Sequence, residues 1–173
     1  GIMNLEVTLR TEHGLKAISL IRDQVKGANV GVGTVCNATE FDAAVDAGAN
    51  FVVSPGQSDA LFERALLTNI PFLPGAVTAT EVMAAKEAGF SVLKFFPAST
   101  SGGAAAIKAF AGPFADLQFV PTGGINLDNA GSYLSLSNVR AVGGSWLTPT
   151  DAIQNGQWEH ITQIAREASQ LGA

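Results

Sequence analysis

Short apolar runs alternate with helical patterns along the chain, and this alternation limits the fold more than any other feature. The runs are about five to eight residues long, and few of them alternate apolar with polar residues. Near-continuous apolar runs are typical of strands that a parallel sheet buries on both faces. We therefore expect parallel strands at Ile2–Leu9, Ala28–Gly33, Phe51–Ser54, Pro71–Gly75, Val92–Phe96, Gln118–Pro121 and Val139–Gly143.

Helical patterns fill the intervals between these runs, and several carry end signals. Asn37 and Ser58 stand where helix N-caps are expected, and Thr80 precedes a third helical pattern. Gly48 and Gly89 stand where helices end. The last helix is expected to gather apolar residues on one face, namely Ile161, Ile164, Ala165, Ala168 and Leu171.

This order is βα repeated seven times without a linker, which predicts one α/β domain over residues 1–173. A doubly wound sheet would satisfy the same order, but the dinucleotide fingerprint is absent, because Gly31-Val32-Gly33 lacks its third glycine. Polar residues follow many different strands, and Gly-Gly pairs follow the last two, at Gly123-Gly124 and Gly143-Gly144. Both features favour a TIM-type (β/α) barrel, and the order supplies seven βα units.

The composition excludes several classes of function. Of 173 residues, 47% are apolar and 14% charged, the net charge is −5, and no basic run occurs, so nucleic-acid binding is not expected. No apolar stretch approaches the ~20 residues that span a bilayer, and no signal peptide opens the chain. We expect a cytoplasmic protein with no membrane partner.

Cysteine and histidine are too few for a metal site or a disulfide. The single cysteine, Cys36, is expected to be a small buried apolar side chain. His160 is expected at the surface of the last helix, and His13 near the rim of the barrel, neither with a role. No metal and no cofactor is therefore expected.

Lys94 is the first candidate catalytic residue. It stands inside the apolar run Val92–Phe96, where its charge would be desolvated. A snorkelling or ion-paired structural lysine is the alternative interpretation. Burial favours the neutral amine, which attacks carbonyl carbons, so this environment suits a Schiff-base nucleophile.

Glu6 and Arg10 belong to the first strand. Glu6 would be a second charge in a strand core, either as an ion-pair partner of Lys94 or Arg10 or as a general acid/base, and the two roles are compatible. Arg10 ends the strand, where it is either a solvated rim charge or a clamp for a carboxylate.

Hydroxyl residues and glycines follow other strands. Thr34, Thr122 and Ser145 would each be turn residues if taken alone. Together with the neighbouring glycines, the segments Thr122–Gly124 and Gly143–Ser145 expose backbone N–H groups that can hold a phosphate.

In this order, these residues resemble the KDPG/KHG aldolase family, whose members cleave 2-keto-3-deoxy-6-phosphogluconate (KDPG) to pyruvate and glyceraldehyde 3-phosphate. Many also act on 4-hydroxy-2-oxoglutarate (KHG). The matching segments span nearly the whole chain: Glu6-Val7-Thr8-Leu9-Arg10-Thr11, Gly31-Val32-Gly33-Thr34-Val35, Val53-Ser54-Pro55-Gly56, Lys94-Phe95-Phe96-Pro97-Ala98, Pro121-Thr122-Gly123-Gly124-Ile125 and Gly143-Gly144-Ser145-Trp146-Leu147.

The resemblance implies a role for each matching residue. Lys94 would be the Schiff-base lysine and Glu6 the acid/base, while Arg10 and Thr34 would hold the pyruvyl carboxylate. Thr122 would help to set stereochemistry at the aldehyde. The remaining substrate-binding residues would be Pro55, Phe96 in the pocket wall, and Gly123, Gly124, Gly144 and Ser145 at the phosphate.

Family members are typically trimers, so the resemblance also implies a homotrimer for the full-length protein. They carry a helix, a first strand and a first helix before the strand at Ile2–Leu9, so these are expected to be absent here. Two other interpretations remain: another sugar-phosphate barrel enzyme, such as an isomerase or synthase, and an inactive barrel fragment that only binds phosphorylated ligands.

Overall fold

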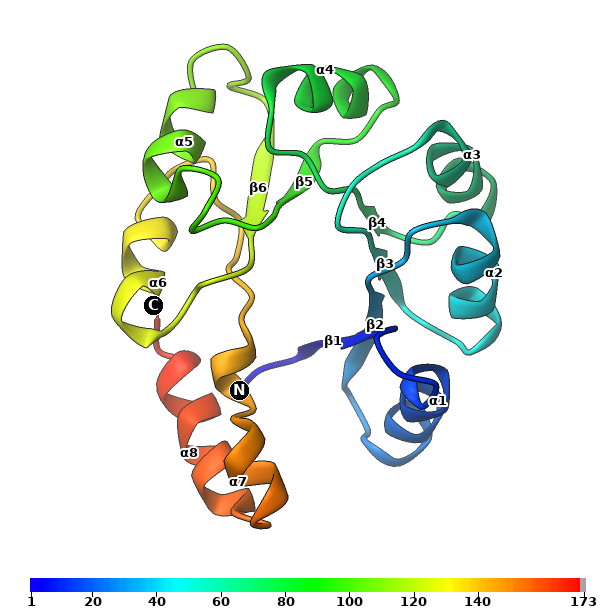
Figure 1. Ribbon diagram of the computed structural model, residues 1–173, viewed down its shortest axis with the longest axis vertical. Coiled ribbons are helices and arrows are strands. Elements are labelled where there is room, and N and C mark those ends of the chain that lie inside the picture. Colours follow the sequence, from blue (N-terminus) through cyan, green and yellow to red (C-terminus); the bar gives the residue numbers. More distant parts are fainter. Residues whose placement is uncertain (172–173) are drawn as a thin grey trace. The chain divides into compact units, whose positions relative to one another are not determined.

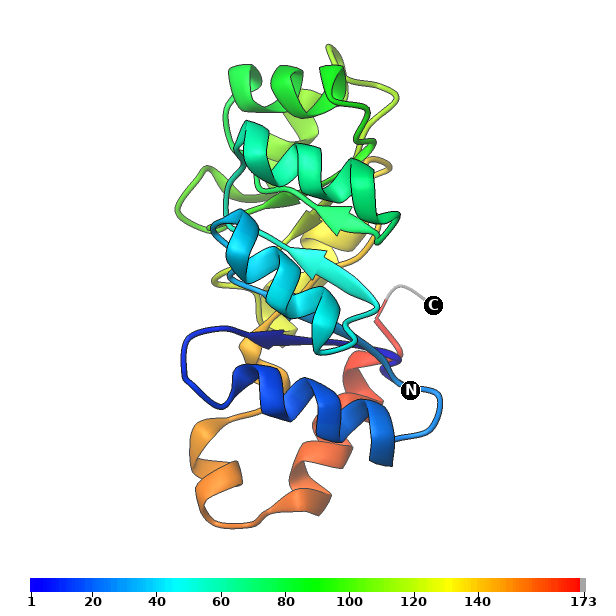
Figure 2. The ribbon, with the colours of Figure 1, turned by 90° about the vertical axis from the view of Figure 1, so that its right-hand side faces the viewer.

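Four strands form a parallel sheet in which the spatial order follows the sequence: β1 (Asn4–Thr8), β2 (Asn29–Gly33), β3 (Phe51–Val53) and β4 (Phe72–Leu73). The structure is a computed structural model that describes residues 1–171. The chain divides into an N-terminal unit, Met3–Lys94, and a C-terminal unit, Gly1–Ile2 with the chain from Phe95 onward. The sheet belongs to the N-terminal unit, in blue to green in Figures 1 and 2.

Helices alternate with these strands, as the sequence predicts: α1 (Gly14–Gln24), α2 (Ala38–Asp46), α3 (Asp59–Thr68) and α4 (Ala79–Glu87). The predicted caps of α2 and α3 are confirmed, because Asn37 accepts from the N–H of Glu40 and Ser58 from that of Leu61. Gly48 and Gly89 take positive φ angles of 84° and 93° after their helices, as C-terminal caps require.

The start of α4 differs from the sequence prediction. The cap is Thr78 rather than Thr80, which lies inside the helix. Thr78 accepts from the N–H of Glu81, and the Glu81 carboxylate accepts from the N–H groups of Val77 and Thr78. Burial raises the pKa of Glu81, but these hydrogen bonds to the ionised form outweigh it, so the pKa is lowered overall from 4.5.

The two faces of the four-stranded sheet have different compositions. Val30, Val32 and Val52 are fully buried on the face that the helices cover. On β1 the opposite face carries Asn4, Glu6 and Thr8, because successive side chains alternate between faces. Aromatic rings pack on the same face as Val52, which the register pairs with Phe72. Phe72 packs edge to face against Phe41 and Phe90, and Phe62 stacks on Phe90. β1 thus presents a polar face, and Phe51 of β3 lies on the same side of the sheet.

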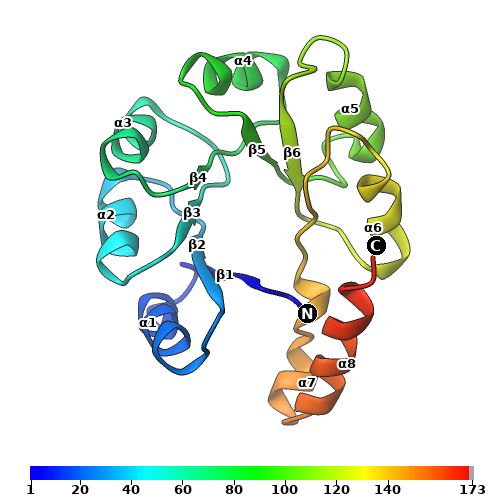
Figure 3. The same ribbon diagram turned by 180° about the vertical axis from the view of Figure 1, so that it is seen from behind.

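The C-terminal unit takes over at the end of β5 (Val92–Phe95), where the carbonyl of Phe95 accepts from the N–H of Thr122. Its own elements are β6 (Gln118–Pro121), α5 (Gly103–Phe110), α6 (Leu127–Leu134), the 3-10 helix η1 (Ser145–Leu147), α7 (Thr150–Gln154) and α8 (Trp158–Ala168). Figure 3 shows these elements from behind, in green to red. Phe95, Phe110 and Phe119 form an aromatic core among them.

The predicted strand Val139–Gly143 is not a regular strand. It makes two isolated parallel bridges, Phe119↔Val139 and Thr122↔Gly143. Gly143 lies four residues after Val139, whereas Thr122 lies only three after Phe119, so one extra residue interrupts the ladder between the bridges. Within residues 1–171 there are thus six strands rather than seven. β4 is also shorter than predicted, because its flanking prolines, Pro71 and Pro74, cannot donate to a ladder.

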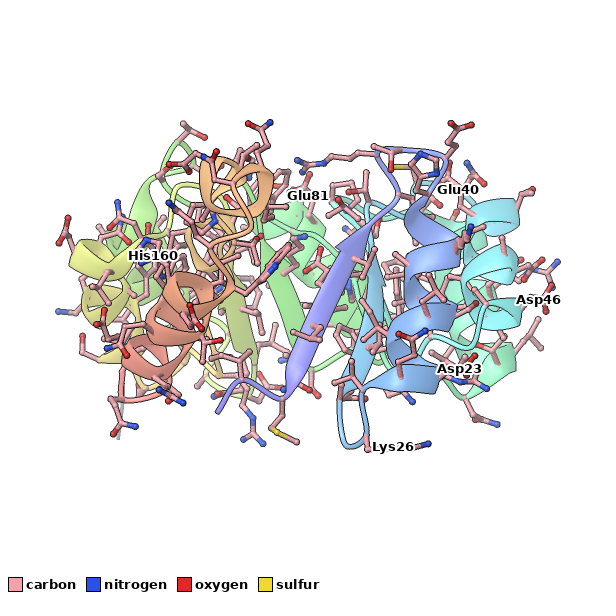
Figure 4. The ribbon with its side chains drawn as sticks, turned by 90° about the horizontal axis from the view of Figure 1, so that it is seen from below. Asp23, Lys26, Glu40, Asp46, Glu81 and His160 are labelled. Atoms are coloured by element: carbon pink, nitrogen blue, oxygen red, sulfur yellow. The ribbon has the colours of Figure 1, made fainter. Side chains whose placement is uncertain are left out.

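Cys36 and the histidines complete the comparison with the sequence. Cys36 is exposed rather than buried, because the buried position in the loop after β2 belongs to Val35. His160 is exposed on α8, as predicted (Figure 4), and His13 is exposed beside Glu12. Across residues 1–171, no helix combines the length and apolar character that a membrane crossing requires.

Candidate active site

Lys94 is buried in β5 and forms an ion pair with Glu6. The backbone of Lys94 is held by the segment after β4, because its N–H donates to the carbonyl of Pro74 and its carbonyl accepts from the N–H of Ala76. Only 7% of its side chain is exposed, and its Nζ lies 3.2 Å from Oε1 of Glu6. The structure therefore confirms that Lys94 is buried and that its amine lies beside the carboxylate of Glu6. Their catalytic roles stay predictions.

Glu6 lies less deeply than the sequence suggests. It was expected in a strand core, but β1 is an edge strand of the four-stranded sheet, and 28% of the Glu6 side chain is exposed. An edge strand has a neighbour on one side only, so its side chains keep more contact with water. Of the two partners considered from sequence, Lys94 is the one that Glu6 contacts, while Arg10 is exposed in the bend after β1.

Thr34 and Pro55 follow the carboxyl ends of β2 and β3. Because the carboxyl ends of parallel strands meet at one edge of a sheet, they share this edge with Arg10. Thr34 has a φ of 65°, which is a rare conformation for a β-branched residue. The carbonyl of Pro55 lies against Gly75, where a Cβ would meet it. No sequence pattern indicates the conformation of Thr34, since threonine normally avoids it.

In the C-terminal unit, Thr122, Gly123 and Gly124 follow β6 as predicted. Gly123 and Gly124 have φ angles of 90° and 75°, a region that favours glycine. A Cβ at Gly123 would lie 3.1 Å from the Phe96 ring. Phe96, which was also predicted as a site residue, therefore lies beside the loop after β6. The hydroxyl of Thr122 is buried and has no hydrogen-bond partner within the described part of the chain. A buried hydroxyl without a partner calls for an explanation, and a bound ligand or water would supply one.

Ser99 is a neighbour of this loop that sequence reasoning missed. Its N–H donates to the carbonyl of Gly123, and a Cβ on Gly124 would collide with its side chain. It stands five residues after Lys94 in a run of Ser and Thr that no motif distinguishes. The contact exists because the loop after β5 packs against the loop after β6, and a single sequence does not reveal this packing.

Gly144 and Ser145 lie at the start of η1. Gly144 has an extended backbone, with φ −165° and ψ 151°, so any residue could adopt its conformation. A Cβ there would collide with the ring of Trp146, which makes glycine a requirement of space. Ser145 is exposed as the first residue of η1.

Among residues 1–171, no three His, Cys, Asp or Glu side chains come together as metal ligands would. The chemistry that the described groups can supply is that of an amine, a carboxylate, hydroxyl groups and backbone N–H groups.

The sequence matches the aldolase family described as KDPG and KHG aldolase over residues 1–164. It is 46% identical to 2-dehydro-3-deoxy-phosphogluconate aldolase of Pseudomonas aeruginosa, over 97% of this chain and 76% of that protein. It is 45% identical to the KHG/KDPG aldolase of Escherichia coli K12, over 97% of this chain and 79% of that protein.

A crystal structure of KDPG aldolase from Legionella pneumophila superimposes with a TM-score of 0.94 at 42% identity, covering 97% of this chain and 82% of that one. That structure holds pyruvate captured at low pH as a covalent carbinolamine intermediate. The parallel α/β fold and these similarities define the chain as an aldolase, a lyase. More particularly, it belongs to the KDPG and KHG aldolase family.

Proposed function

We propose that this protein cleaves KDPG to pyruvate and glyceraldehyde 3-phosphate through a Schiff base on Lys94. The observation that carries the proposal is the buried Lys94 amine 3.2 Å from the Glu6 carboxylate. An amine in a position of low water access next to a proton acceptor is what attack on a ketone requires. The relatives named above, which carry this activity in their names, support the same assignment.

In the proposed reaction, Lys94 Nζ attacks the keto carbon of the substrate, and Glu6 moves protons as the carbinolamine forms and loses water. Cleavage of the carbon–carbon bond then leaves the electron pair on the iminium, giving an enamine, while the hydroxyl proton of the aldehyde fragment is removed. Protonation of the enamine and hydrolysis of the iminium release pyruvate. The hydrogen bond from Lys94 Nζ to Glu6 Oε1 supports this role, because general acid/base catalysis needs hydrogen-bond reach.

The other site residues are proposed as substrate-binding groups. Arg10 and Thr34 hold the pyruvyl carboxylate, for which a guanidinium is well shaped. Pro55 is a further substrate-binding residue, Phe96 lines the pocket wall, and Thr122 contacts the aldehyde portion through its unpartnered hydroxyl. The phosphate is bound by the backbone N–H groups of Gly123, Gly124 and Gly144 with the hydroxyl of Ser145.

The wider properties are proposed on the same basis. The 173 residues are one aldolase domain whose βα units belong to a (β/α)8 barrel, and the bridged segment Val139–Gly143 takes the place of the seventh strand in this chain. The protein is a cytoplasmic homotrimer that acts on a small phosphorylated 2-keto acid, and it also accepts 4-hydroxy-2-oxoglutarate. The E. coli relative, named for both KHG and KDPG, supports the second substrate.

The test is trapping with pyruvate and borohydride. Reduction of the Schiff base should add a stable pyruvate-derived mass to the protein, and peptide mapping should locate it on Lys94. Lys94→Arg keeps the charge but removes the reversible amine, so the variant should take up no adduct and lose cleavage by several orders of magnitude. An adduct on folded Lys94→Arg protein would refute the role of Lys94, and no adduct on the folded parent would favour the non-aldolase interpretations.

A further inference from the structure

Gly33, the last residue of β2, lies on the same face of the sheet as Glu6. The parallel register pairs Glu6 with Gly31 and Thr8 with Gly33. Paired residues in a parallel ladder present their side chains to the same face, as do residues two apart on one strand. Glu6, Gly31 and Gly33 therefore share the polar face, and both positions of β2 beside Glu6 lack a side chain.

The space beside Gly33 is filled by the Glu6 side chain. A Cβ built on Gly33 would collide with Oε1 of Glu6 and lie 2.7 Å from its Cδ and 2.8 Å from its Cγ. Oε1 is the same oxygen that accepts from Lys94. The carboxylate thus lies across the Cα of Gly33 in the position from which it contacts the lysine.

Backbone conformation does not explain the glycine at position 33. Gly33 is a regular residue of β2 and is not one of the glycines with a positive φ angle. Gly31 differs from Gly33 in this respect. The atoms nearest to a Cβ at Gly31 are carbons of the Phe51 ring, not atoms of a carboxylate. At position 33 the requirement is space, and the group that uses this space is the carboxylate.

We propose that Gly33 is a positioning residue for Glu6: without a side chain, it lets the carboxylate cross β2 and reach Lys94. The inference rests on the proposed role of Glu6 as the proton-transfer group. A side chain at position 33 would push a flexible, partly exposed carboxylate aside rather than displace backbone. The substitution should therefore spare the fold and impair the chemistry.

The experiment compares Gly33→Ala with Gly131→Ala, a substitution in α6 that meets nothing within 4 Å. Gly33→Ala should keep the thermal midpoint of the parent within a few degrees and should still form the borohydride-trapped pyruvate adduct. Its kcat should fall about 10²-fold with little change in KM, because misplacement by about 1 Å has costs of this order. Exchange of the pyruvate methyl protons should slow in parallel, while Gly131→Ala should match the parent. Parental kcat in Gly33→Ala would overturn the inference.

A double substitution tests whether the effect passes through Glu6. In a Glu6→Gln background the base is already lost, so adding Gly33→Ala should lower kcat little further. A second full loss would mean that Gly33 acts elsewhere and would overturn the inference. A crystal structure of Gly33→Ala tests the geometry without relying on catalysis: a Lys94 Nζ–Glu6 Oε1 distance that stays near 3.2 Å would overturn the positioning role. Parental turnover in Glu6→Gln alone would instead refute the proposed role of Glu6.

Discussion

Glu6 is the residue whose chemistry can be changed with the least change in shape. Glu6→Gln keeps the side-chain size and one acceptor oxygen but removes the base. Turnover should drop by about 10²–10⁴, the usual contribution of general acid/base catalysis, and pyruvate methyl-proton exchange should slow to match. The measurement is steady-state cleavage together with proton exchange by NMR.

A suitable control for this substitution is Glu63→Gln on the exposed surface of α3. It makes the same chemical change away from Lys94 and should keep parental rates. If exchange in Glu6→Gln continues at the parental rate, another group or water moves the proton.

Gly124 tests the proposed phosphate loop. Gly124→Ala would force a residue with a Cβ into a φ of 75° and against Ser99, which prevents close approach of the backbone to a ligand. The loss in kcat/KM should be larger for KDPG than for unphosphorylated 4-hydroxy-2-oxoglutarate. Gly131→Ala should change neither, and an equal loss for both substrates would indicate general damage to the loop instead of a phosphate site.

At the scale of elements, the capping box of α4 should make stability depend on pH. The pKa of Glu81 is lowered from 4.5 in the folded protein, so its carboxylate contributes stability above the unfolded pKa, and this is lost as the pH falls through the folded value. Glu81→Gln should therefore lower the free energy of unfolding at pH 7 by more than it does well below pH 4.5.

Urea unfolding of parent and variant at both pH values measures this difference. Glu87→Gln, an exposed change on the same helix outside the capping box, provides the control. A stability difference between Glu81→Gln and the parent that does not change with pH would contradict an ionised cap.

The elements also show how far sequence reasoning reaches. Periodicity and caps located β1, β2, β3, β5, β6, α2 and α3, because those signals are local. Thr78 was missed as a cap since Thr80 is an equally good candidate in the same run. The exposure of Glu6 and the interrupted segment at Val139 depend on which strands pair, and pairing is a property of the tertiary structure.

The candidate site divides in the same way. Residue chemistry named Lys94 and Arg10 as possible partners of Glu6, because a buried charge needs a partner, and Lys94 is the one that the structure shows. The positive φ of Thr34, the neighbour Ser99 and the space at Gly33 have no sequence signature. Each is set by how two segments meet, so it became visible only with atomic positions.

For the whole molecule, the proposed homotrimer is testable by mass. Light scattering coupled to gel filtration should give about three times the chain mass of 17.8 kDa at micromolar concentration, since closed cyclic assemblies have fixed copy numbers. Dilution should leave a tight trimer unchanged. A mass near that of one chain at every concentration would contradict the assembly.

The distance along the chain between Glu6 and Lys94 affects how the protein acquires activity. The pair is separated by 88 residues, so no short peptide contains both groups. Bringing the two groups together costs the entropy of closing the segment between them. The non-local contacts among β1 to β5 offset this cost. In a chain whose strands have not yet assembled, the Lys94 amine and the Glu6 carboxylate are not in contact. The ion pair between the two groups therefore forms only when β1 and β5 are both in place.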